Sequence, residues 1–457
     1  MIFLRACPPV LIIFTAVILG FVNNPAAAQE GLFEHDRFTG DWGGARKQWE
    51  DAGVAFGATD VSETLSNPTG GIRQLTIYQG LLDVSLNLDL DKLLKWPGAT
   101  FYTDAYWISG EGLSRNAVGN LLAASSIEAL ASTRLHDMWL QQAFLNDQAS
   151  LRVGQIALDD EFYISQYSAG FVNSTFGCPD IWSTDLPSGG ACYPFATPGA
   201  RLRVAPTTGL TFSAAAFNGN PAPPGPGDPQ VLNSSGTNFL IGEGGFMPIA
   251  ELAYSFDEEP IASNRLSDVK LGVWYHTGDF PDLRRDNSGH SLADPSSSGI
   301  PATHGSNFGA YLVVDKMLWR RPDTATQGLA AFFRIGYAPP DRNLISLEID
   351  AGLTFKGLCP NRNLDVLGVG ASYARIGYAR RLDRDEVLFT GIERPIRDYE
   401  AVLEITYAAR IAPWWLLQPD LQLVFHPVGF TSAPLPAPVD RPIPNALVVG
   451  LRSAITF

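Results

Sequence analysis

The chain has 457 residues, a formal net charge of −15, 17% charged residues and 46% hydrophobic residues. This hydrophobic content excludes a disordered chain, and a sequence pI of about 4.8 leaves nucleic acid without electrostatic attraction, so we expect no nucleic-acid partner. The mean hydropathy is only +0.03, and beyond the N-terminus no stretch approaches the roughly 18 apolar residues of a spanning helix. Few charges, 11% aromatic residues and 44 glycines favour an all-β protein.

Residues 1–28 are predicted to be a secretory signal peptide. A basic start at Arg5 precedes the apolar run 10–22, and alanines at 26–28 supply an A-x-A cleavage motif. In the oxidising compartment that export implies, Cys178 and Cys192 are predicted to form a disulfide, which leaves Cys359 unpaired. No His or second Cys stands near these cysteines at ligand spacing, so we expect no metal and no cofactor.

Residues 29–53 are predicted to form a periplasmic segment with a short helix over 41–53. Asp41 is the expected N-cap and Gly53 the expected stop. The remaining residues, 54–457, are predicted to form one β-barrel domain.

The barrel prediction rests on segments in which polarity alternates. In 79–90, Leu82, Val84 and Leu86 are apolar while Asp83, Ser85 and Asn87 are polar, which indicates a strand with one wet face. About sixteen segments read this way, near the length that a tilted membrane-crossing strand needs. They are 54–65, 79–90, 99–109, 136–146, 150–157, 200–206, 210–218, 247–256, 268–277, 307–317, 328–338, 346–356, 365–378, 399–409, 414–426 and 446–457.

The lengths of the connections alternate as well, with two short exceptions among the external links, 66–73 and 339–345. Links such as 147–149, 207–209 and 410–413 are short, whereas 110–135, 158–199, 219–246, 278–306, 379–398 and 427–445 are long. An up-and-down barrel of the outer membrane sorts its connections in this way, with periplasmic turns and long external loops. The final strand ends on Phe457, which resembles the signal read by the barrel-assembly machinery.

Alternation also predicts which charged side chains face the lumen, because a charge facing lipid costs about 2 to 4 kcal/mol at the midplane. If Leu151 and Val153 face outer-membrane lipid, Arg152 faces inward. The inward set predicted in this way contains Asp83, Arg152, Arg201, Arg203, Arg334 and Glu404, together with Asn87, Asp89 and Arg452.

The longest loop, 158–199, is expected to fold into the lumen and narrow it. Its aromatic residues offer flat faces to sugar rings, with Phe176 and Trp182 the preferred candidates, and Glu161 offers a hydrogen-bond acceptor. Packing of these aromatic rings against the barrel wall is the alternative.

Several motifs, which together cover nearly the whole mature chain, resemble those of the OprB-type carbohydrate-selective porins. They include 39–46 (TGDWGGAR), 151–155 (LRVGQ), 198–204 (PGARLRV), 216–221 (AFNGNP), 336–343 (GYAPPDRN) and 412–415 (APWW). The resemblance implies a sixteen-stranded outer-membrane barrel with an eyelet of arginine, carboxylate and aromatic side chains that passes monosaccharides. It places Arg201 and Arg203 in a matching motif, and it suggests Arg73, where the first external loop re-enters the barrel, as an eyelet arginine.

The leading hypothesis is therefore a passive porin for small neutral sugars of the glucose type. A general or weakly anion-selective porin is the alternative within transport. An enzyme is not expected, because no G-x-S-x-G motif occurs and neither His276 nor His426 lies near a serine motif. A soluble secreted β protein is disfavoured by the alternating loop lengths.

Overall fold

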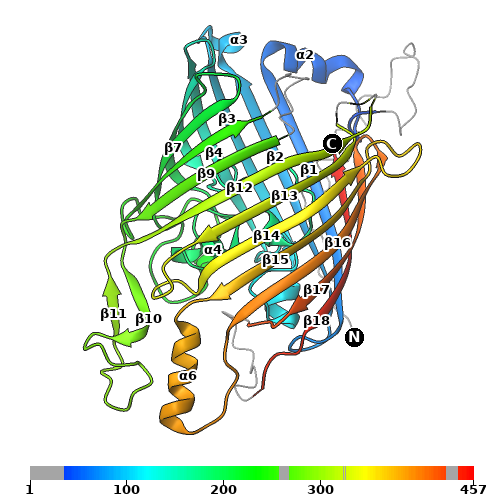
Figure 1. Cartoon of the computed structure of the whole chain (residues 1–457). Helices are drawn as coiled ribbons and strands as arrows, with labels where there is room; N and C mark the ends of the chain where they lie inside the picture. The colour runs from blue at the N-terminus through cyan, green and yellow to red at the C-terminus, as the bar shows by residue number, and fades with distance from the viewer. Residues whose placement is uncertain (1–34, 257–266, 323, 325, 429–440) are drawn as a thin grey trace, which may run out of the picture.

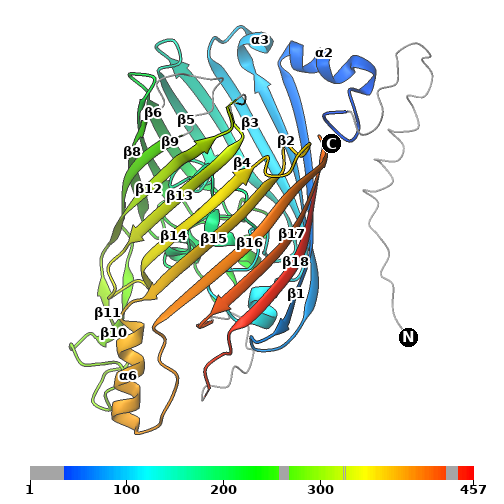
Figure 2. The same cartoon turned by 45° about the vertical axis from the view of Figure 1, so that its right-hand side comes forward.

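The computed structural model describes residues 35–256, 267–322, 324, 326–428 and 441–457; the predicted signal peptide, 1–28, lies outside them. Sixteen strands form one closed barrel (Figures 1 and 2). They are β1 (Val54–Thr69), β2 (Thr76–Asp89), β3 (Ala99–Gly110), β4 (Ser132–Phe144), β5 (Ala149–Ile156), β6 (Thr197–Val204), β7 (Leu210–Asn218), β8 (Phe246–Ser255), β9 (Ser267–His276), β12 (Asn307–Arg320), β13 (Gly328–Tyr337), β14 (Ile345–Lys356), β15 (Val366–Ile376), β16 (Tyr399–Ala412), β17 (Trp415–Phe425) and β18 (Ala446–Thr456).

The pairing of the strands confirms the predicted all-β, up-and-down architecture. Each strand pairs with its neighbours in antiparallel fashion, and β1 pairs with β18 to close the barrel. Exposure alternates with period two: in β15, Val369 and Tyr373 are exposed while Ser372 and Ala374 are buried. Each strand therefore has an outward apolar row and an inward row.

Two of the connections predicted to be loops contain regular secondary structure. The 278–306 link carries a two-stranded sheet of β10 (Phe280–Asp286) and β11 (Pro301–His304), and the 379–398 link carries α6 (Ala379–Thr390). The shorter elements are η1 (Trp42–Gly44), α2 (Ala45–Ala52), α3 (Leu90–Leu94), η2 (Ser114–Val118), η3 (Ser174–Phe176), α4 (Asp180–Ser183), η4 (Pro187–Gly189) and α5 (Pro229–Leu232). In the part of the chain that is described, no helix has the length and apolarity to cross a membrane.

The N-terminal helix is present, but its predicted cap is wrong. The N-cap of α2 is Gly44, in the left-handed conformation, and Asp41 instead precedes the η1 turn and accepts a hydrogen bond from the Lys47 amide at 3.2 Å. The predicted stop is confirmed, because Gly53 ends α2 with φ of 101°, a conformation that favours glycine.

The N-terminal segment packs on the end of the chain. The Arg46 guanidinium donates to the Phe457 carbonyl oxygen at 3.0 Å, and the rings of Phe38 and Phe457 meet edge to face with centroids 5.6 Å apart. Figure 2 shows α2 and the C-terminus at the same end of the barrel. Recognition of Phe457 by the assembly machinery stays a prediction.

Chain segments that include α4 lie inside the barrel (Figure 1), and two inward loops supply many residues of the hydrophobic core. Leu113 and Leu122 come from loop 111–131, and Phe162 and Trp182 come from loop 157–196; all are at most 1% exposed and belong to one cluster with wall residues such as Val402. The loops therefore fill lumen that would otherwise be open, as expected for the longest loop.

Candidate functional site

The long inward loop is closed on itself by a disulfide. Cys178 and Cys192 are bonded, with their Cα atoms 6.0 Å apart, and their side chains pack in or against the lumen core. This confirms the predicted pair. Cys359 is free and half-buried.

Wall carboxylates hold the inward loops by their backbone amides. Glu404 on β16 accepts from the amides of Val172 and Asn173 at 2.7 and 2.9 Å, and Glu348 on β14 accepts from two amides of α4 at 3.0 and 2.6 Å. These bonds satisfy backbone donors that burial inside the barrel would otherwise leave without a partner. We name the following set the clamping carboxylates, all of which accept loop amides: Glu251, Asp315, Glu348, Glu400 and Glu404.

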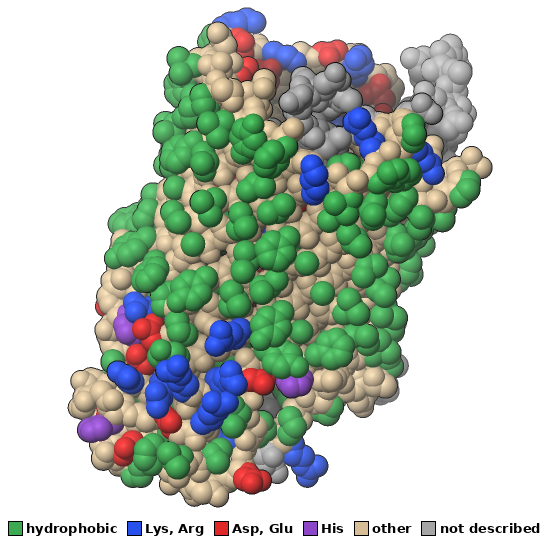
Figure 3. All heavy atoms as spheres, viewed as in Figure 1, with side chains coloured by type: hydrophobic (Ala, Val, Ile, Leu, Met, Phe, Trp, Pro, Cys, Tyr) green, Lys and Arg blue, Asp and Glu red, His purple; other side chains and the backbone are tan. Residues whose placement is uncertain are grey.

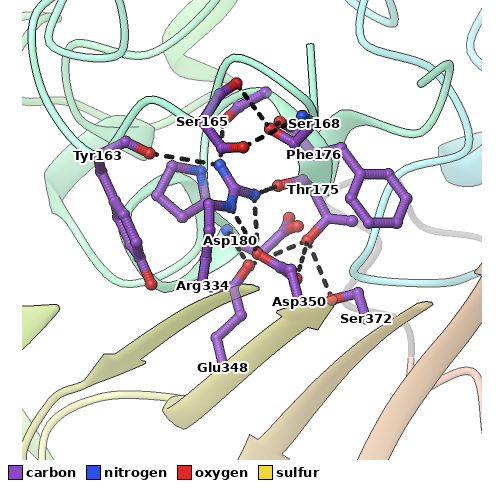
Figure 4. A network of polar contacts seen from close by, with 12 residues as sticks. Tyr163, Ser165, Ser168, Thr175, Phe176, Asp180, Arg334, Glu348, Asp350 and Ser372 are labelled. Atoms are coloured by element: carbon purple, nitrogen blue, oxygen red, sulfur yellow. Dashed lines mark hydrogen bonds and ion pairs between the residues drawn. The ribbon is translucent and has the colours of Figure 1, made fainter. Parts of the chain in front are cut away.

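Arg334 on β13 belongs to the same attachment (Figure 4). Its guanidinium donates to Asp350 at 2.7 and 3.0 Å, to the Gly177 carbonyl oxygen at 3.0 Å and to the Thr175 carbonyl oxygen. Arg334 and Glu404 face inward as predicted, but both are 0% exposed because loop 157–196 covers them. They position the loop and do not line a water-filled path.

The two aromatic residues predicted to contact solute are buried as well. Trp182 is 0% exposed and packs against Tyr163 and Tyr311 with ring centroids 5.4 and 5.8 Å away. Phe176 is 1% exposed and packs against Phe332 of the wall. Neither ring has a face open to a sugar. Both residues pack against the barrel wall, which is the alternative given for them from the sequence.

Arg152, Arg201 and Glu161 are brought together at the wall. Glu161, at the start of the long loop, accepts from Arg152 and from the Arg201 Nε at 2.7 Å, and both arginines donate to the Gln141 side-chain oxygen. Arg152 also lies over the Trp139 ring, 3.6 Å from its centroid. The side chain of Arg152 keeps 17% exposure and that of Arg201 keeps 4%, so Arg152 is the more accessible guanidinium. We name Gln141, Arg152, Glu161 and Arg201 the arginine group.

Arg203 lies two residues after Arg201 on β6, in the same inward row, and is nearer to the short turn between β4 and β5. It lines a cavity of about 310 Å³ together with Gln141, Ser150 and Asp147. Arg203 pairs in register with Ser150, and Ser150 also accepts from Arg201 at 2.7 Å. The cavity is therefore continuous with the arginine group.

Asp83 lies in an acidic group on the neighbouring wall. It is within electrostatic reach of Asp104 and His136, and ligand atoms of His136, Asp137 and Asp160 lie within 4.8 Å of one another. Asp160, like Asp159, is one of the loop acids predicted to accept hydroxyl hydrogen bonds, whereas Asp104, His136 and Asp137 are not predicted from the sequence. Asp104 lies in a strand of alternating polarity next to Ala105, which faces outward. The alternation that predicts an inward Asp83 therefore predicts an inward Asp104 as well.

The start of the long loop carries two adjacent acids of this group. Asp160 is exposed, whereas Asp159 is half-buried and its Oδ2 accepts from the Tyr193 amide at 3.4 Å. Burial and the neighbouring Asp160 carboxylate raise the pKa of Asp159 to about 7. At this point in the lumen acidic side chains therefore stand beside the arginine group.

Arg73 is apart from these groups. It is exposed in the connection between β1 and β2, and its Nε donates to the Asn116 carbonyl oxygen at 2.7 Å, on loop 111–131. None of its hydrogen bonds to the described residues reaches the arginine group. Arg73 thus lies at the mouth of the barrel, against loop 111–131.

Three side-chain clusters resemble metal-ligand sets among the described residues, and in one of them, Asp159 with Cys178 and Cys192, the two cysteines are already bonded to each other. The other two are His136 with Asp137 and Asp160, and Asp282 with His304 and Asp341. Both oxygens of Asp137 already accept hydrogen bonds, at 2.9 and 3.1 Å. Asp341 is paired with Arg342 at 2.8 Å, which brings a competing positive charge. Contacts within the chain therefore account for both clusters.

Comparison with known proteins agrees with this geometry. A family model described as carbohydrate-selective porin, OprB family, matches residues 73–457. Porin B of Pseudomonas aeruginosa is 23% identical over 460 residues, which cover 95% of each chain.

Two solved structures of OprB from Pseudomonas putida share the fold. The high-pH structure has a TM-score of 0.80 at 22% identity and covers 94% of this chain and 100% of that chain. The low-pH structure has a TM-score of 0.56 at 16% identity and covers 93% and 99%. These relatives are porins, which are channels and not enzymes. With its closed barrel and inward loops, the chain belongs to the OprB family of carbohydrate-selective porins and is a channel of the bacterial outer membrane.

Proposed function

We propose that the channel passes small neutral monosaccharides of the glucose type by passive diffusion past an eyelet in which the partly exposed Arg152 is held by Glu161 and by the buried Arg201. The observation that carries this proposal is the joining of two inward arginines and one loop carboxylate at the wall, beside the cavity that Arg203 lines. Planar guanidinium forks bind pairs of oxygens, and carboxylates accept hydroxyl hydrogen bonds. Such groups bind sugars at several points without holding them long.

The mixture of charges supports a neutral solute. Exposed Asp160 and half-buried Asp159 stand near the arginines, so the path presents both signs within a short distance. A neutral sugar has hydroxyl donors and acceptors for both, whereas an inorganic anion meets acids as well as arginines. The alternative of a weakly anion-selective porin is favoured less by this arrangement.

The test is a titration of glucose against the ion current of single channels in planar bilayers. We expect millimolar glucose to reduce the current, because a bound sugar occupies the eyelet. Liposome swelling with neutral monosaccharides, amino sugars and sugar acids of equal size then ranks the solutes. An unchanged current in glucose, with a reversal potential that favours chloride in a salt gradient, would support the anion-selective alternative instead.

Arg152 gives the sharpest variant, because it is the more exposed arginine of the pair. Arg152→Gln removes a charged donor worth about 1.5 to 3 kcal/mol, so the glucose concentration for half block is expected to rise roughly tenfold or more. Arg152→Lys keeps the positive charge but lacks the planar fork of the guanidinium, so its half-block concentration is expected to lie between those of the parent and Arg152→Gln. Arg320→Gln is the matched control. Arg320 is exposed and is the last residue of β12, at the end of the strand that is away from the external loop. Equal half-block concentrations in Arg152→Gln and in the control would contradict the eyelet assignment.

A further inference from the structure

An arginine stands in the outward row of β15, where the apolar surface ends. The row runs Val369, Ala371, Tyr373 and then Arg375, all of them exposed. Charged residues on this face are strongly disfavoured within the hydrocarbon layer. Arg375 therefore marks the level at which the wall leaves that layer.

The neighbouring strands show that this level is the aromatic girdle. Arg375 pairs in register with Leu347 on β14 and with Tyr399 on β16, and Leu347 pairs with Tyr337 on β13, which is 50% exposed. Tyrosines in such rings sit at the depth of the lipid headgroups. The end concerned carries the long loops, which face outward from the cell in bacterial barrels. The guanidinium of Arg375 is thus at the headgroup level of the outer leaflet.

More arginines follow directly in α6. The helix begins against the wall, since the Gly377 and Tyr378 amides donate to the carbonyl oxygens of the β13–β14 connection at 2.8 and 2.6 Å. Arg381 and Arg384 on α6 are exposed, and Arg381 lies 4.1 Å from the centroid of the Tyr378 ring. In Figure 3, Lys and Arg side chains gather below the apolar band, towards the end that carries α6.

The acids of α6 do not neutralise these arginines. Each is paired elsewhere: Asp383 with Arg397 at 2.6 Å, Asp385 with Arg284 at 2.7 Å, and Glu386 with Arg394. Among the residues that the structure describes, Arg375, Arg381 and Arg384 form no ion pair. An unneutralised basic surface on a chain of net charge −15 calls for an anionic partner.

We propose that Arg375, Arg381 and Arg384, named the arginine patch, bind the phosphorylated headgroup of an outer-leaflet lipid. Arg375 lies on the outside of the wall, and Arg381 and Arg384 are exposed on the helix that follows it, so the patch is separate from the arginine group of the sugar path. Arg375 stands at headgroup depth and α6 begins at Ala379, four residues later, so a membrane phosphate at that depth meets Arg375 first and the helix arginines beyond it. Guanidinium groups bind phosphate oxygens bidentately, and an arginine near the membrane surface contributes about a fivefold gain in affinity for anionic lipid.

The experiment uses the purified full-length barrel in neutral detergent, with bisphosphorylated lipid A as the probe and dephosphorylated lipid A as its counterpart. Binding is measured by native mass spectrometry across a lipid titration. Parent protein is expected to prefer the phosphorylated lipid, and Arg375→Gln and Arg381→Gln each to weaken its binding about fivefold. The triple variant with Arg384→Gln is expected to lose the preference, while the Lys substitutions retain most of it.

The control is Arg320→Gln, an exposed arginine at the opposite end of the barrel wall. Because the patch residues are exposed and outside the lumen, the melting temperature and the single-channel current of each variant should match those of the parent, which verifies folding. The proposal is overturned if the triple variant keeps the parent's preference, if dephosphorylated lipid binds equally well, or if Arg320→Gln weakens binding as much as the triple variant does.

Discussion

Removing one clamping carboxylate tests how the long loop stays in the lumen. Glu404 is 0% exposed and accepts two loop amides, those of Val172 and Asn173, at 2.7 and 2.9 Å. Glu404→Ala leaves both amides buried without an acceptor. An unsatisfied buried donor costs about 1 to 3 kcal/mol, so the two together weaken attachment of the loop by about 2 to 6 kcal/mol. Glu404→Gln keeps one acceptor oxygen and is expected to cost about half as much.

The measurements are single-channel conductance and limited proteolysis of folded barrels. A loop that leaves the lumen widens the path, so Glu404→Ala is expected to conduct more current, with larger fluctuations, and to be cut within 157–196 sooner than the parent. Asn87→Ala is the matched control, because Asn87 is an exposed residue on the inward face of β2. If Glu404→Ala conducts and resists protease as the control does, the carboxylates do not hold the loop and the argument for clamping fails.

Three further predictions concern the same loop. Trp182→Ala, at a fully buried ring, is expected to lower the free energy of unfolding in denaturant by about 3 to 5 kcal/mol; a loss below 1 kcal/mol would show that the ring is not packed as described. The double variant Cys178→Ser, Cys192→Ser opens a ring whose cysteines are 14 residues apart, and a loss of about 3 kcal/mol is expected, reproduced by reducing the parent. Burial raises the pKa of Asp180 well above its ordinary value, so its contribution to stability is complete below the unfolded-state pKa and is lost as pH rises through the folded-state pKa. Between pH 4 and pH 8 the melting temperature of the parent should therefore fall more steeply than that of Asp180→Asn, and parallel curves would contradict this.

The barrel was predictable because each strand carries its own evidence. Leu151 and Val153 are outward and exposed, so the inward direction of Arg152 follows from two neighbours in sequence. The same local rule gave the right direction for Arg334 and Glu404. It also predicts the inward direction of Asp104, whose neighbour Ala105 is exposed.

Burial of those inward residues was not predictable in the same way. The residues that cover Glu404 come from a loop 232 positions earlier in the chain, and no local pattern records which part of a loop meets which strand. The same reason explains why the prediction for Trp182 was wrong. An aromatic ring in a long loop can stack on a sugar or pack against the barrel wall, and the packing of Trp182 on Tyr311 of β12 is visible only in the fold. Likewise, α6 and the β10–β11 sheet lack the alternation of the barrel strands.

The attachment of the inward loops separates two properties of this channel that are often considered together. The width and chemistry of the path depend on loops and on inward side chains such as Glu348, whereas the fit to the bilayer depends on the outward rows. One strand thus carries two nearly independent sets of positions, which alternate along it. Selectivity can therefore diverge between homologues, or be redesigned by exchanging a loop together with its carboxylate partners, while every residue that meets lipid stays the same.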